Sequence, residues 1–166
     1  MQRNNLIEYF TLYIESLCSK HVDIQHSEEN KHFIRLDKIE MLESHKTISY
    51  PVVTVEKLTV SYSDTEDAMT KSRHIEMMFL NNIPDIGDAD NIESVWSHME
   101  SIAEDFILKI KTDRRDRNKY PFLHNLQMSS MELDYVENIA THLYGVLLSF
   151  SCNLPFFDCI ENRFSE

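Results

Sequence analysis

The clearest pattern of apolar and polar positions lies between Ile92 and Thr112. Apolar residues recur there at steps of three and four, as they do on one face of an amphipathic helix. These residues are Ile92, Val95, Trp96, Met99, Ile102, Ala103, Phe106, Ile107 and Ile110. We expect this helix to lie across a sheet with its apolar face down, so that Trp96 and Phe106 belong to the core.

A second helical pattern covers residues 4–20, in which apolar positions from Leu6 to Leu17 have the same spacing. A shorter helix is expected between Asp37 and Lys46, with Asp37 as its N-cap. The polar stretch 21–32 is typical of a loop, or of a short strand and a turn. The pattern therefore predicts an N-terminal helix and one minor helix before the first long strand.

Two stretches in the middle of the chain favour β-strands. Residues 50–64 are rich in Val, Thr and Tyr, but the alternation falters from Glu56 to Leu58, which indicates a bulge or a switch of faces. Residues 73–84 alternate between apolar and polar positions and predict an antiparallel partner strand. The segment 63–72 between them is polar, and we expect it to be a connection rather than a strand.

Two further strands are expected near the C-terminus. Residues 131–135 alternate, and the run "LYGVLLSFSC" alternates after a turn. Gly145 inside a strand indicates a bulge or the close approach of another backbone or a large aromatic ring. Pro155 should end the strand, because proline cannot donate a ladder hydrogen bond.

Together these elements predict one α+β domain over residues 1–166. It consists of an antiparallel sheet of about four strands, packed against a long amphipathic helix and an N-terminal helix. Residues 155–166 form a short C-terminal tail.

Composition narrows the classes of partner. The net charge of −12 disfavours a nucleic-acid-binding surface, because phosphate groups require a positive one. No apolar stretch approaches the roughly 20 residues that span a bilayer, and the first residues do not resemble a signal peptide. We therefore expect no membrane partner and no sequence-specific nucleic acid.

Motifs for common chemistry are missing from the sequence. The two glycines stand in neither GxGxxG nor GxxxxGK[ST], and no GxSxG occurs. The eight histidines show no HxH or HExxH spacing, and Cys18, Cys152 and Cys159 form no CxxC pair. We expect no catalytic residue, no cofactor and no metal, although an enzyme of unrecognised type remains an alternative.

The run "KTDRRDRNK", from Lys111 to Lys119, carries five cations and two acids within nine residues of an acidic protein. Such a run is either a solvated helix end or a contact with an acidic surface, for example that of a neighbouring copy; DNA is a weaker third choice. The candidate contact residues are Arg114, Arg115 and Arg117.

A second candidate interface lies in the C-terminal tail. It contains large apolar residues that a small domain has little room to bury, namely Phe156, Phe157, Ile160 and Phe164. Exposed aromatic residues on a terminal segment often mark a partner contact. The alternative is that the tail packs back onto its own sheet.

The element order resembles that of small phage neck and tail-completion proteins, and of the tail-terminator class in particular. The resemblance is carried by the helix from Leu6 and by "SYPVVTVE", "VWSHMESIAEDFILKI" and "LYGVLLSFSCNLPFFDCI". It implies a non-catalytic ring of copies of this chain, often sixfold, which is assembled in the host cytoplasm and located in the virion. Such a ring caps a tail tube or joins it to the connector.

An alternative function stays open beside this resemblance. The acidic composition is also compatible with a monomeric adaptor or immunity-type protein that binds one basic protein partner. Salt-sensitive binding of a single partner would be the signature of such a protein.

Overall fold

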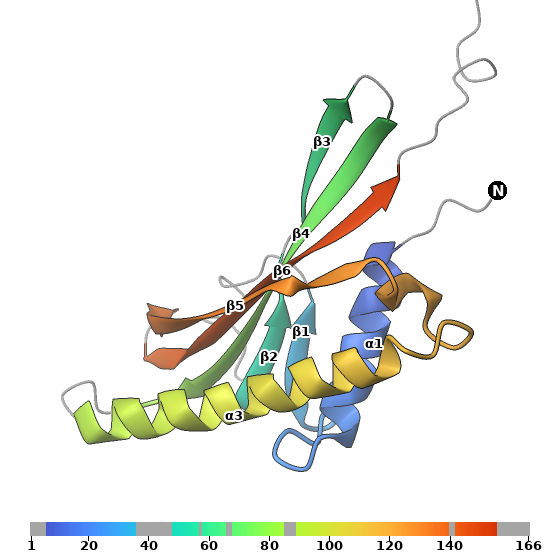
Figure 1. Cartoon of the computed structure of the whole chain (residues 1–166). Helices are drawn as coiled ribbons and strands as arrows, with labels where there is room; N and C mark the ends of the chain where they lie inside the picture. The colour runs from blue at the N-terminus through green and yellow to red at the C-terminus, as the bar shows by residue number, and fades with distance from the viewer. Residues whose placement is uncertain are drawn as a thin grey trace, which may run out of the picture.

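The computed structural model describes residues 6–35, 48–56, 58–65, 68–84, 89–139 and 142–155. These residues form two α-helices, one short 3-10 helix and six strands (Figure 1). The helices are α1 (Leu6–Lys20), α3 (Ala89–Asp113) and η1 (Pro121–Leu123). The strands are β1 (Lys31–Arg35), β2 (Ile48–Val55), β3 (Thr59–Thr65), β4 (Ala68–Asn82), β5 (Leu126–Ile139) and β6 (Leu143–Pro155).

The strands form one mixed sheet in the order β1-β2-β4-β6-β5, and β3 also pairs with β4. The α+β class is therefore confirmed, but the expected sheet of about four antiparallel strands is wrong. The described residues form six strands, and β1 pairs with β2 in the parallel sense. The short strand β1 gives little signal in the sequence, because Phe33 is its one fully buried side chain.

The expected irregularity near Glu56 is confirmed as a bulge between β2 and β3. Three residues separate Val55 from Thr59, whereas two separate their partners Met77 and His74 on β4. One extra residue is thus inserted on the β2–β3 side, which locally bends and twists the strand.

Beyond the bulge, the sheet continues as an arm that extends past both helices (Figure 1). We define the arm as β3, residues 68–74 of β4 and residues 151–155 of β6, which pair with one another. The expectation of a polar connection over residues 63–72 is therefore wrong for its described residues. Backbone pairing holds them in strands even though their side chains do not alternate.

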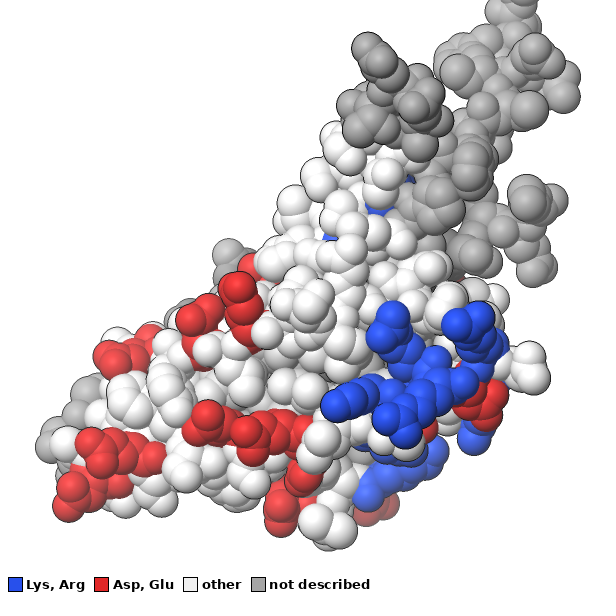
Figure 2. Space-filling view, in the orientation of Figure 1, with Lys and Arg blue, Asp and Glu red and all other residues white. Residues whose placement is uncertain are grey.

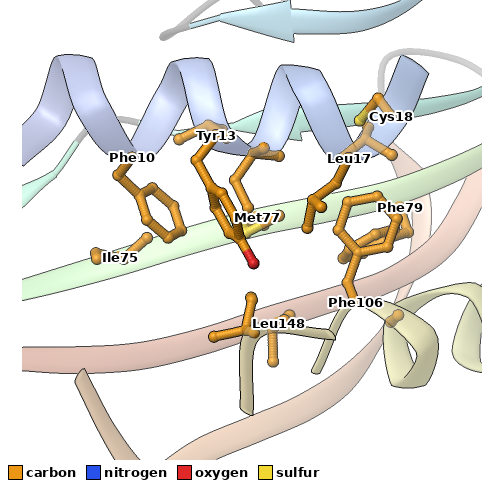
Figure 3. Packing of buried hydrophobic residues seen from close by; sticks show 14 of the residues in the cluster. Phe10, Tyr13, Leu17, Cys18, Ile75, Met77, Phe79, Phe106 and Leu148 are labelled. Atoms are coloured by element: carbon orange, nitrogen blue, oxygen red, sulfur yellow. The ribbon is translucent and has the colours of Figure 1, made fainter. Parts of the chain in front are cut away.

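Helices α1 and α3 both pack against one face of the sheet, and the main core lies between them and the strands (Figure 3). Phe10 and Leu17 of α1 point toward the sheet, where β4 contributes Ile75, Met77 and Phe79. Phe106 is buried as expected, and its ring lies edge-on to Phe79 with 5.1 Å between the centroids. These contacts with α1 and the sheet set the direction of α3, and therefore where its two charged ends lie.

Trp96 differs from the expectation, because it is half-buried rather than part of the core. Its indole nitrogen donates a hydrogen bond to the Val136 carbonyl at 3.2 Å, and its ring lies 5.3 Å from that of Tyr135. Trp96 therefore lies where α3 meets the edge strand β5, and not under the centre of the sheet.

Gly145 lies where a close backbone approach was expected. It stands opposite Leu80 on β4, and a Cβ added at Gly145 would collide with the carbonyl oxygen of Phe79. Strand β6 is described as far as Pro155, which pairs with Thr70 of β4, and the residues after it lie outside the described part of the chain. The expected helix between Asp37 and Lys46 lies outside the described residues.

Candidate interaction surfaces

The end of α3 carries a cluster of cations that we call the basic patch: Lys111, Arg114, Arg115 and Arg117. Together with His124 and Met128 they line a hollow of about 530 Å³. Figure 2 shows Lys and Arg side chains gathered in one area of this face. The structure thus brings together the three arginines that the sequence singled out, and adds Lys111 and His124 to them.

The turn after α3 orients these arginines. The Nε of Arg114 donates a hydrogen bond to the His124 carbonyl at 3.2 Å, which holds this half-buried side chain in place. Arg115 and Arg117 are exposed. None of the three forms an ion pair with a carboxylate in the part of the chain that the structure describes, so their charge is available to a partner.

Asp113 lies within the basic run, but its carboxylate points into the protein. It is 8% exposed and accepts hydrogen bonds from the Tyr13 hydroxyl at 2.9 Å and from the Lys109 Nζ at 2.8 Å. The pKa of Tyr13 is raised above its ordinary range, mainly by burial of the hydroxyl and secondly by its hydrogen bond to Asp113. The sequence did not indicate that the carboxylate of Asp113 is buried between Tyr13 and Lys109. Because Asp113 is engaged inside, it neutralises little of the charge of the patch.

Carboxylates lie toward the other end of α3 and along β5. We define the acidic face as Glu93 and Glu100 of α3 with Glu137 of β5; Glu100 is half-buried and the other two are exposed. Figure 2 shows Asp and Glu side chains over the part of this face away from the basic patch, and a few directly beside the patch. The charges of the two signs are therefore largely segregated.

An aromatic pair is set within the acidic face. Tyr135 is 56% exposed, stands beside Trp96, and donates a hydrogen bond from its hydroxyl to Glu100 Oε2 at 2.8 Å. This bond to a carboxylate is the main reason why the pKa of Tyr135 is raised. No local pattern in the sequence indicates this pair, because β5 brings Tyr135 over a helix residue 35 positions away.

The arm exposes apolar side chains on the face that elsewhere forms the core. Val60 stands opposite Arg73, and Tyr62 opposite Lys71, two and four residues before the buried Ile75. Residues paired in this way share a face of the sheet. Among the side chains of the arm that the structure describes, the exposed large apolar ones are Val60, Tyr62 and Met69.

Two cations accompany these apolar residues. The Nζ of Lys71 lies 5.3 Å from the centre of the Tyr62 ring. The Nε and Nη1 atoms of Arg73 are buried, and no acceptor among the described residues forms a hydrogen bond with either. An interaction surface on the arm would thus be apolar with a positive component.

Groups that could support catalysis are dispersed among the described residues. Cys18 and Cys152 are buried and unpaired; burial raises the pKa of both thiols, that of Cys152 to about 11. His21 lies 3.3 Å from Asp105 beside a hollow of about 320 Å³, whose described lining contains no Ser, Thr or Cys. No three described His, Cys, Asp or Glu side chains are placed to hold a metal ion.

Phe156, Phe157, Ile160 and Phe164, the second predicted interface, lie outside the described residues. No described helix is long and apolar enough to cross a membrane. No family model matches the chain, and no curated protein matches it either.

Proposed function

We propose that this protein is a structural subunit of a phage or phage-like particle, in which copies of the chain join into a ring at the neck or tail end. In this role it terminates a tail tube or connects the tail to the head, and it needs no catalytic group. The phage context comes from the resemblance of the element order and of the quoted segments.

The observation that carries the proposal is the arm. It extends past both helices, and Val60, Tyr62 and Met69 are exposed on the face that forms the core elsewhere. Exposed apolar surface of this kind is typical of a protein–protein contact. A neighbouring copy that covered the arm would remove these side chains from water, at about 25 cal/mol per Å² of apolar area.

The proposal is tested by the oligomeric state of the purified full chain. Sedimentation velocity at several concentrations, together with negative-stain images, should reveal a closed ring. We expect the variant Val60→Ser/Tyr62→Ser/Met69→Ser to keep the wild-type circular dichroism spectrum and to sediment as a monomer. Leu12→Ser/Val22→Ser is the matched control, because both residues are exposed apolar residues outside the arm.

A wild-type chain that remains monomeric at high concentration, and also beside a tail-tube protein, would contradict the proposal. An arm variant that assembles like the wild type would remove its main support.

A second candidate function is a monomeric adaptor that binds one basic protein. The acidic face favours it, because Glu93 and Glu137 offer exposed carboxylates. Salt-sensitive binding with one-to-one stoichiometry would distinguish this function from ring formation.

A further inference from the structure

We propose that the basic patch of one copy binds the acidic face of the next copy, so that this charged contact sets the direction in which the subunits join. This inference rests on the proposed function and names the partner of the basic patch. The arm is a separate surface, and the charged contact can be tested independently of it.

The length of α3 excludes a contact between Glu93 and Arg114 of one chain. Glu93 is near the start of α3, and Arg114 directly follows the last residue of that helix. The step of 21 residues from Glu93 to Arg114 corresponds to about 30 Å at 1.5 Å per residue. A straight helix cannot bring its own ends together, so Glu93 and Arg114 can meet only between copies.

The chemistry of the two surfaces is complementary. Arg115 and Arg117 are exposed and form no ion pair with a described carboxylate. The acidic face offers carboxylates around the exposed ring of Tyr135. A guanidinium group binds a carboxylate in a bidentate manner and also stacks on aromatic rings, which makes such a face a better partner for arginine than for lysine.

A second copy also fits the charge of the whole chain better than a nucleic acid does. With a net charge of −12, the protein repels phosphate backbones beyond the patch itself. A second copy presents the acidic face directly to the patch, and opposite charges steer the association of protein surfaces.

The contact joins two different surfaces, so it is heterologous. Each copy uses its basic patch toward one neighbour and its acidic face toward the other. Contacts of this type produce a ring when the rotation between neighbours closes, and an open filament when it does not.

The test uses two charge-reversed variants of the full chain. The first, Arg115→Glu/Arg117→Glu, reverses the charge of the two exposed arginines of the patch; the second, Glu93→Lys/Glu137→Lys, reverses the charge of the two exposed carboxylates of the face. We expect each variant alone to associate at least tenfold more weakly than the wild type in sedimentation velocity. An equimolar mixture should associate again, because each substituted residue then meets a residue of opposite charge on the neighbouring copy.

The control is Lys31→Glu/Arg35→Glu, which changes the net charge as much as the patch variant does, at two exposed residues of β1. It should associate like the wild type. Circular dichroism spectra verify that all variants are folded.

The outcomes separate this inference from the proposed function. If the wild type assembles and the mixture stays dissociated, or if the patch variant assembles normally, the charged contact is wrong while the ring remains. If the patch variant assembles normally but loses binding to a DNA duplex, the patch is a nucleic-acid contact instead. A wild-type chain that never assembles overturns both proposals.

Discussion

The hydroxyl of Tyr13 donates a hydrogen bond of 2.9 Å to the buried carboxylate of Asp113, 100 positions further along the chain. Tyr13 is on α1 and Asp113 is the last residue of α3. This bond joins the two helices at the point where the basic patch begins. It therefore connects the stability of the helical layer to the placement of the arginines.

Replacing Tyr13 by Phe should lower the free energy of unfolding by about 1–3 kcal/mol, because the buried Asp113 carboxylate loses a donor. Urea denaturation would measure the loss. Tyr9→Phe serves as the control, since Tyr9 is half exposed and its ring would still stack on Phe122. Equal effects of the two substitutions would mean that the Tyr13–Asp113 bond adds nothing to stability.

Alkaline pH should destabilise the protein in part through Cys152. Burial raises the pKa of this thiol from 9.0 to about 11, so above pH 9 the unfolded chain releases a proton that the folded chain retains. Its contribution to stability is therefore full below pH 9 and is lost as the pH rises through 11. Urea denaturation at several pH values between 8 and 11 gives the free energy of unfolding as a function of pH. This free energy should fall less steeply with pH for Cys152→Ala than for the wild type. An equal decrease of the free energy of unfolding with pH in both proteins would show that Cys152 does not contribute to the pH dependence.

Gly145→Ala should destabilise the sheet by about 1–3 kcal/mol, because the new methyl group would collide with the Phe79 carbonyl oxygen on β4. Ser151→Ala on the same strand is the control, since it adds no atom, and it should change stability by less than about 0.5 kcal/mol. Thermal denaturation of both variants would compare them. A neutral Gly145→Ala would mean that β4 and β6 can separate locally without cost.

Phe106→Ala should cost about 3–5 kcal/mol, because the ring is fully buried against Phe79. Trp96→Ala should cost at least about 1 kcal/mol less than Phe106→Ala, since Trp96 is half-buried at the edge of the sheet. Urea denaturation of the two variants decides the order. The reverse order would place Trp96, and not Phe106, at the centre of the helix–sheet contact.

Truncation after Pro155 should leave a folded domain, because the pairing of β6 with β4 extends to that residue. We expect the truncated chain to assemble less well, since it lacks Phe156, Phe157, Ile160 and Phe164. Circular dichroism and sedimentation of the full and truncated chains are the measurements. Unfolding would assign the tail to the core, and normal assembly would remove these four residues from the interface.

Elements with a strong local pattern were predictable from the amino-acid sequence alone. The apolar spacing from Ile92 to Ile110 predicted α3, because a helix repeats every 3.6 residues and its buried face is readable in one segment. The faltering alternation near Glu56 indicated a bulge or a switch of faces, and the register of β2 and β3 on β4 has the bulge. Gly145 indicated a close backbone approach, since a missing side chain leaves space for one.

Features that depend on partners distant in the sequence were not predictable in this way, because packing sets them. Strand β1 exists because a parallel neighbour supplies its hydrogen bonds, and the arm exists because β4 pairs with β3 and β6 over residues that carry no apolar alternation. Trp96 is peripheral because α3 meets an edge strand at that point, although its spacing matches that of buried residues.

The same division applies to the candidate surfaces. The run of arginines was visible in the sequence, but the inward orientation of Asp113 was not, because it depends on a donor 100 positions away. The acidic face likewise joins residues of α3 and β5 that are neighbours only in space. Periodicity encodes which side of an element is apolar, whereas a surface is assembled from several elements whose relative placement is set by packing.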